Sequence, residues 1–63
     1  MRTQMSECLT RAEHDAGFIV GALQDVLSHS GAVEALIVLR LIEQAVMLQT
    51  RITEYAQARR SQP

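Results

Sequence analysis

The sequence predicts an all-α fold, namely an antiparallel helical hairpin that dimerises into a four-helix bundle. Apolar residues recur at alternating steps of three and four, the one cluster of turn-forming residues lies near the middle of the chain, and the single proline is Pro63. A proline ring breaks a helix interior, so nothing in residues 1–62 interrupts two long helices. A chain of 63 residues is also short enough to predict one domain, residues 1–63.

The first helix is predicted over about residues 6–27, with Thr3 or Ser6 as its N-cap. Its apolar positions are spaced as in a helix that packs lengthwise against partner helices. They are Met5, Leu9, Ala12, Ala16, Ile19, Leu23 and Val26.

Gly17 and Gly21 interrupt this helix with the spacing of small residues at which two helices approach closely. Each glycine costs about 1 kcal/mol of helix stability relative to alanine, so a compensating contact is expected. That contact is either the second helix of the same chain or a helix of a partner subunit. Alternatively, the glycines loosen the helix so that it remodels on meeting a target.

A turn is predicted over residues 28–31, which read Ser-His-Ser-Gly, and a second helix over about residues 32–59. A link this short makes the two helices antiparallel. The apolar positions of the second helix are Val38, Leu41, Ala45, Leu48, Ile52 and Tyr55. The hairpin core is predicted to contain Leu23, Val26, Val38, Leu41, Leu48 and Ile52.

More than one face of the second helix is apolar, and a single neighbouring helix covers only about one face. The excess predicts an interface, because large exposed apolar patches are uncommon on monomers. The predicted interface residues are Leu36, Ile37, Leu39, Ile42, Val46, Gly17 and Gly21. Leu39→Glu or Ile42→Glu is predicted to give a monomer or to unfold the chain. A homodimer is expected, and an obligate complex with another chain would cover the same leucines.

Neither an intramolecular disulfide nor a zinc site is expected to stabilise so short a chain. Cys8 is the only cysteine, and with His14 and His29 it does not match a standard zinc spacing. Cys8 is predicted to be a small buried hydrophobic residue, and a disulfide across a dimer interface stays open. Oligomerisation is the remaining source of stability.

Catalytic, cofactor-binding and metal-ligating residues are not expected. Glu13, His14 and Asp15 are consecutive, so they point in different directions around a helix and do not form a catalytic group alone. Two antiparallel helices also offer little concavity for a substrate. The sequence therefore predicts that the protein is not an enzyme and uses no cofactor.

The predicted function is that of a small regulatory or adaptor protein that acts by helix-mediated protein–protein binding, as an inhibitor of a host protein or a co-chaperone. The apolar runs are too short to cross a bilayer and the N-terminus lacks a secretory signal, so a cytoplasmic location is expected.

The alternative function is a dimeric hairpin that binds RNA or DNA through Arg51, Arg59 and Arg60. Length and layout are similar to those of the small plasmid-encoded RNA-regulating hairpins, a likeness of architecture without a shared motif. A net charge of −1 and the absence of lysine make nucleic acid a less favoured partner than protein.

Overall fold

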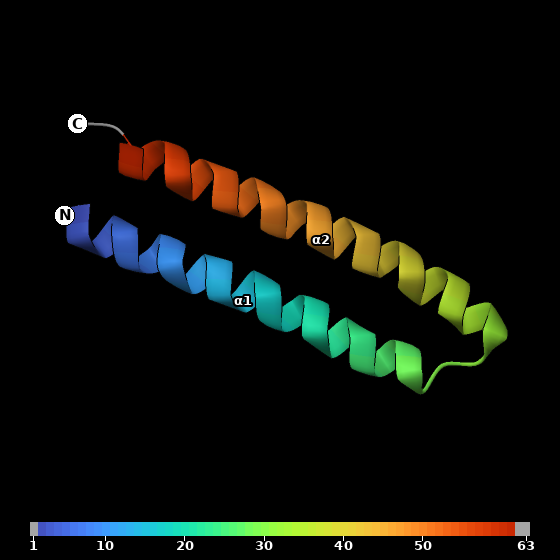
Figure 1. Ribbon diagram of the computed structural model, residues 1–63. Coiled ribbons are helices and arrows are strands. Elements are labelled where there is room, and N and C mark those ends of the chain that lie inside the picture. Colours follow the sequence, from blue (N-terminus) through green and yellow to red (C-terminus); the bar gives the residue numbers. More distant parts are fainter. Residues whose placement is uncertain (1, 62–63) are drawn as a thin grey trace.

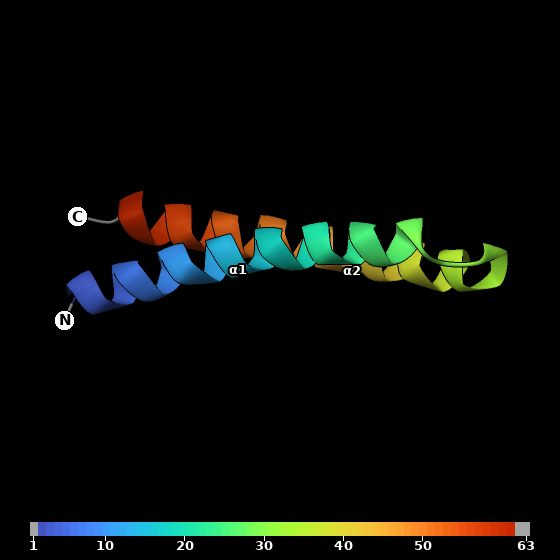
Figure 2. The same ribbon diagram turned by 90° about the horizontal axis from the view of Figure 1, so that it is seen from below.

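The protein is an all-α hairpin of two long helices. A computed structural model describes residues 2–61, with side chains for residues 4–61. Helix α1 spans Arg2–Ser28 and helix α2 spans Ala32–Ser61. The helices run antiparallel and side by side, with residues 2 and 61 at the end away from the turn (Figures 1 and 2). The predicted hairpin is therefore confirmed, as a rod with extents of 49 × 15 × 11 Å.

Both helices are longer than predicted. Helix α1 begins before Thr3 and Ser6, so neither residue ends it as an N-cap, and α2 continues past Arg59 to Ser61. No proline or glycine occurs in either extension, so each helix continues along residues that tolerate helical geometry.

Residues 29–31 link the two helices, and hydrogen bonds satisfy backbone groups at both helix ends. The N–H groups of His29 and Ser30 donate to the carbonyls of Val26 and Leu27, and the Ser30 hydroxyl donates to the Val26 carbonyl. On the other side, the N–H of Ala35 donates to the Gly31 carbonyl at 2.8 Å, which makes Gly31 the cap of α2. These bonds satisfy groups that a helix end otherwise leaves to water.

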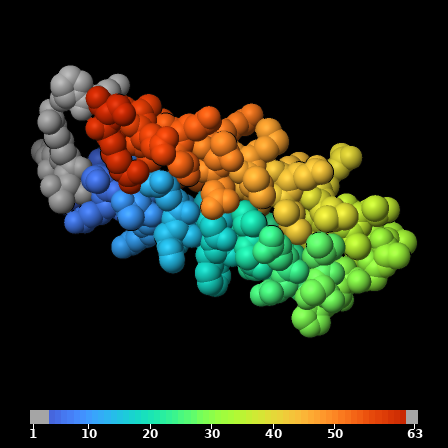
Figure 3. Space-filling model, in the orientation of Figure 1, coloured from blue at the N-terminus to red at the C-terminus, as the bar shows by residue number. Residues whose placement is uncertain are grey.

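Most buried and half-buried residues follow one stripe along each helix, here called the seam, at alternating steps of three and four. The other half-buried helical residues, Ala12, Gly17, Gly21 and Thr53, lie next to this stripe. In α1 the seam contains Leu9, Glu13, Ala16, Val20, Leu23 and Leu27. In α2 it contains Ala35, Val38, Ile42, Ala45, Gln49, Ile52 and Ala56. The side chains of the two helices meet along the whole hairpin (Figure 3).

The seam corrects part of the predicted core. Leu23, Val38 and Ile52 lie in it as predicted, whereas Val26, Leu41 and Leu48 are exposed. The other predicted positions that turn out to be exposed are Met5, Ile19 and Tyr55. In each helix, alternate positions of the predicted pattern are shifted by one residue. Where the pattern has Ile19, Val26, Leu41 and Leu48, the seam has Val20, Leu27, Ile42 and Gln49.

The physical reason is that the predicted pattern and the seam share one row of residues in each helix. The row on either side of this shared row can complete the contact with the other helix. The row that α2 covers includes Glu13, and the row that α1 covers includes Gln49. The row left outside contains Ile19 and Val26 in α1 and Leu41 and Leu48 in α2. The spacing of apolar residues predicts that the row with Ile19 and Leu48 completes the contact between the helices. In the structure, the row with Glu13 and Gln49 completes it instead.

The resulting core is thin. Among the described residues only Ala16, Val38 and Ala56 are buried, and no large side chain is fully buried. One salt bridge across the helices, Arg60 Nη2 to Glu13 Oε1 at 2.7 Å, lies partly exposed near the open end. Exposed ion pairs contribute about 0–1 kcal/mol, so this contact does not replace the missing apolar burial.

Candidate protein-interaction surface

Exposed apolar side chains from both helices gather on one side of the hairpin. Ile19 and Val26 each come one position before a seam residue of α1, and Leu41 and Leu48 each come one position before a seam residue of α2. Because both helices are right-handed and run antiparallel, positions shifted from the seam in the same sense lie on the same side. This side is here called the apolar face.

The apolar face extends along most of the hairpin. Its exposed large residues are Ile19 and Val26 from α1, and Ile37, Leu41, Leu48 and Tyr55 from α2. The other positions that precede a seam residue hold Cys8, Ala12 and Ala22 as well as Asp15, Glu34, Gln44 and Arg51. The face is therefore mainly apolar, with Glu34 near the turn and with Asp15 and Arg51 near its middle.

The opposite side follows the seam residues by one position and is more polar. In α1 it holds Thr10, His14, Gly17, Gly21, Gln24 and Ser28. In α2 it holds Leu36, Leu39, Glu43, Val46, Thr50, Thr53 and Gln57. Its large apolar residues come from α2 alone, so the apolar part of this side is narrower than the apolar face.

The structure distributes the predicted interface residues over three places. Ile37 lies on the apolar face, whereas Leu36, Leu39 and Val46 lie on the opposite side, and all four are exposed. Ile42 is half-buried in the seam. The predicted set thus combines two surfaces and one residue of the hairpin contact. It leaves out Val26, Leu41 and Leu48, which were predicted in the core, and Ile19, which was predicted only as part of the apolar pattern of the first helix.

The two glycines of α1 have different surroundings. A Cβ atom built on Gly17 would lie 3.2 Å from Nε2 of the Gln49 side chain, so a side chain of α2 reaches Gly17. A Cβ atom built on Gly21 would meet nothing within 4 Å. The neighbour of Gly17 is thus a side-chain amide of α2 rather than a helix backbone.

Gly21→Ala is expected to stabilise the protein by about 1 kcal/mol, because alanine is the better helix former and its methyl group meets no other atom. Urea denaturation monitored by circular dichroism measures the change. Gly17→Ala is the matched comparison and should gain less, since Gln49 must shift. An unchanged or lower midpoint for Gly21→Ala would mean that another helix backbone occupies this space.

The three arginines of the nucleic-acid alternative do not form one free cluster. Arg60 donates to Glu13 at 2.7 Å and to the Thr10 hydroxyl at 3.2 Å. The guanidinium carbon of Arg59 lies 6.0 Å from the centre of the Tyr55 ring, at the outer range of a cation–π contact. Arg51 is exposed on α2. Intramolecular contacts therefore engage two of the three cations.

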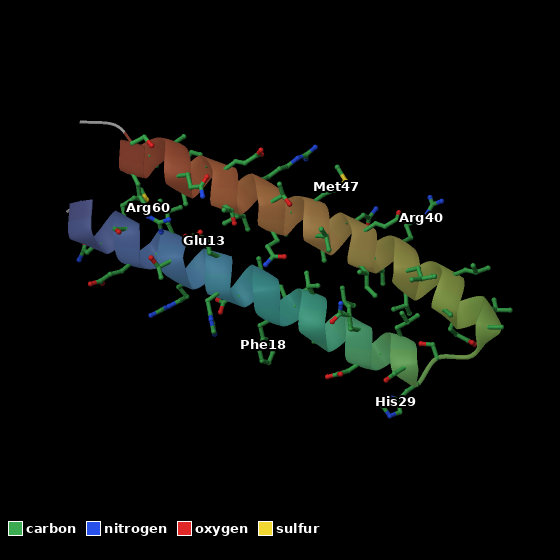
Figure 4. All side chains as sticks on the ribbon, in the orientation of Figure 1. Glu13, Phe18, His29, Arg40, Met47 and Arg60 are labelled. Carbon is green, nitrogen blue, oxygen red and sulfur yellow. The ribbon has the colours of Figure 1, made fainter. Side chains whose placement is uncertain are left out.

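Several side chains point away from both the seam and the apolar face. Phe18 projects from α1 on the side away from α2, and Arg40 and Met47 project from α2 on the side away from α1 (Figure 4). Met47 is 54% exposed, close to the 52% of its neighbour Leu48. The two neighbours have similar solvent exposure but point in different directions.

Most of the remaining polar residues within 4–61 are exposed. Cys8 is exposed, so the prediction that it is buried is wrong. It precedes the seam residue Leu9 rather than lying in the seam itself. Ser28 and Nδ1 of His29 lie 3.2 Å apart at the turn. In this part of the chain, His, Cys, Asp and Glu side chains do not gather in threes where they can hold a metal ion.

A shallow depression lies on α2 alone, lined by Leu36, Ile37, Arg40, Leu41 and Gln44. It borders the apolar face at Ile37 and Leu41. Neither helix, over the residues described, contains a segment long and apolar enough to cross a membrane.

The chain matches no protein-family model, no curated protein and no solved structure.

Proposed function

We propose that the protein is a small non-enzymatic regulator or adaptor that acts by helix-mediated protein–protein binding. The observation that carries this proposal is that large apolar side chains of both helices lie exposed on one side of the hairpin, where the apolar face holds Ile19, Val26, Leu41 and Leu48. Monomers seldom expose contiguous apolar surface of this extent unless it binds something. Protein helices supply the apolar side chains that complement such a surface.

A second copy of the chain is the first partner in this proposal, giving a four-helix bundle. Among residues 4–61, the isolated hairpin buries only three, all of them small or medium-sized. Small domains with so little core depend on oligomerisation, a metal or disulfides. A bundle of four helices would give each hairpin a second apolar layer.

A target protein in the cytoplasm is the second partner. Leu36 is 70% exposed and lies on the side opposite the apolar face, close to the turn. Pairing through the apolar face leaves Leu36, Leu39 and Val46 accessible to a target helix. A host enzyme, a transcription factor or a protein whose amphipathic helix needs shielding would each present such a helix.

Light scattering of the purified protein across a dilution series, with circular dichroism on the same samples, tests the proposal. We expect twice the chain mass of 7.0 kDa at high concentration, and a loss of helicity as dilution separates the copies. A particle of single-chain mass with full helicity at every concentration would contradict pairing. For the target, Leu36→Glu should keep the paired mass and lose a protein that co-purifies with the wild type in fixed ratio.

A further inference from the structure

The apolar face runs the length of the hairpin and has contributions from both helices, so its occupant must be equally long and apolar. We propose that this occupant is the same face of a second copy, with the two turns at the same end, so that α1 of each copy packs against α2 of the other. The proposal rests on the pairing in the proposed function and specifies its face and its geometry.

The surface area of the chain supports a partner of this size. A compact protein of 7.0 kDa exposes about 4,000 Å², whereas this chain exposes 5182 Å². The excess is roughly 1,100 Å² per chain. A stable dimer of standard size buries about 800 Å² on each partner, so the excess surface is sufficient for one such interface.

The side chains also fit this arrangement. The side-chain amide of Gln49 reaches Gly17, which places these two residues at about the same level along the hairpin. When residues are counted along the two antiparallel helices from Gly17 and Gln49, Ile19 is level with Leu48 to within one residue. Val26 is level with Leu41 in the same way. A two-fold axis parallel to the helices preserves these levels, so Ile19 and Val26 of each copy meet Leu48 and Leu41 of the other, while the small Ala22 meets Gln44. Ala12 similarly meets Tyr55, a small residue against a large one.

The charges select this arrangement over its alternative. Asp15 and Arg51 are both exposed, each comes one position before a seam residue, and they stand level with each other. With both turns at one end, Asp15 of each copy faces Arg51 of the other. With the turns at opposite ends, α1 would pack against α1 and α2 against α2, and neither charge would meet its opposite. Electrostatic complementarity therefore favours turns at the same end.

Leu48→Glu and Met47→Glu test the face, because the two side chains differ by only 2% in exposure but, as consecutive residues of one helix, point in different directions. Leu48→Glu places two carboxylates in the interface and should raise the dimer dissociation constant about 100-fold or more, measured by sedimentation equilibrium. Met47→Glu should leave the constant within about threefold of wild type, as expected for a side chain outside the interface. A dimer that survives Leu48→Glu, or separates with Met47→Glu, overturns the proposed face while the pairing itself stands.

Charge exchange tests the arrangement and remains informative if Leu48→Glu unfolds. Asp15→Arg alone should weaken the dimer about fivefold or more, since two like-charged pairs replace two opposite ones. Adding Arg51→Asp should restore the constant to within about twofold of wild type, because the opposite-charge pairs form again. No rescue in the double variant would overturn the same-end geometry. A wild-type chain that never dimerises would overturn the proposed pairing as well, which separates the two failures.

Discussion

Ile42→Glu is expected to unfold most of the protein. Ile42 is half-buried in the seam, so the substitution removes an apolar contact between the helices and places a carboxylate at their interface. Losing the half-buried side chain alone costs about 1 kcal/mol, and a carboxylate placed between the helices adds to this cost. A hairpin in which three of the described residues are buried has little stability to lose. Far-ultraviolet circular dichroism at one protein concentration should show the loss of most helical signal.

Leu39→Glu is the comparison, because Leu39 is exposed on the side opposite the apolar face. We expect this variant to remain helical and paired, with a stability loss of about 1 kcal/mol or less from the half-covered leucine. The sequence alone predicts that both substitutions break the assembly. The structure predicts different outcomes, because Ile42 lies between the helices and Leu39 is exposed. Equal loss of helicity in the two variants would show that the side bearing Leu39 is also covered by a partner.

Ala56→Leu is expected to destabilise the protein by about 1–3 kcal/mol, the usual cost of adding methylene groups to a filled site. Ala56 is the one described residue with 0% exposure, and it lies where α2 meets the first half of α1. Its small side chain allows the helices to lie close together, so leucine must push them apart. Thermal denaturation at fixed protein concentration should show a lower midpoint.

The control for this variant is Ala58→Leu, two residues further along the same helix and exposed. Alanine and leucine have similar helix propensity, so this change should alter stability by less than about 0.5 kcal/mol. Equal destabilisation at both positions would point to fraying of the end of α2 rather than to overpacking of the seam.

The sequence predicts the architecture well because the decisive signals are local. The turn at 28–31 and the lack of helix breakers on either side of it are properties of neighbouring residues, and the observed helices, Arg2–Ser28 and Ala32–Ser61, flank that turn. Helix ends are less determined, since a few residues without a strong cap or breaker can extend a helix in either direction.

The identity of the residues between the helices could not be predicted in the same way. Val26 and Leu27 are both apolar neighbours in the sequence, and periodicity alone ranks the row of Val26 first because Glu13 interrupts the row of Leu27. Only the packed structure shows that Glu13 is accommodated, through its ion pair with Arg60. The choice between two adjacent rows depends on contacts between residues far apart in the chain, which a local pattern does not contain.

The placement of both described chain ends at one end of the rod determines how the hairpin would respond to mechanical force. Tension applied between residues 2 and 61 pulls the helices apart from their open end, so it loads one level of the seam at a time. The Arg60 to Glu13 ion pair, close to that end, would be among the first contacts to break, followed by the contacts around Ala56. The geometry is one of unzipping rather than shear, and the molecule should open at low force in a stepwise manner that ends at the turn.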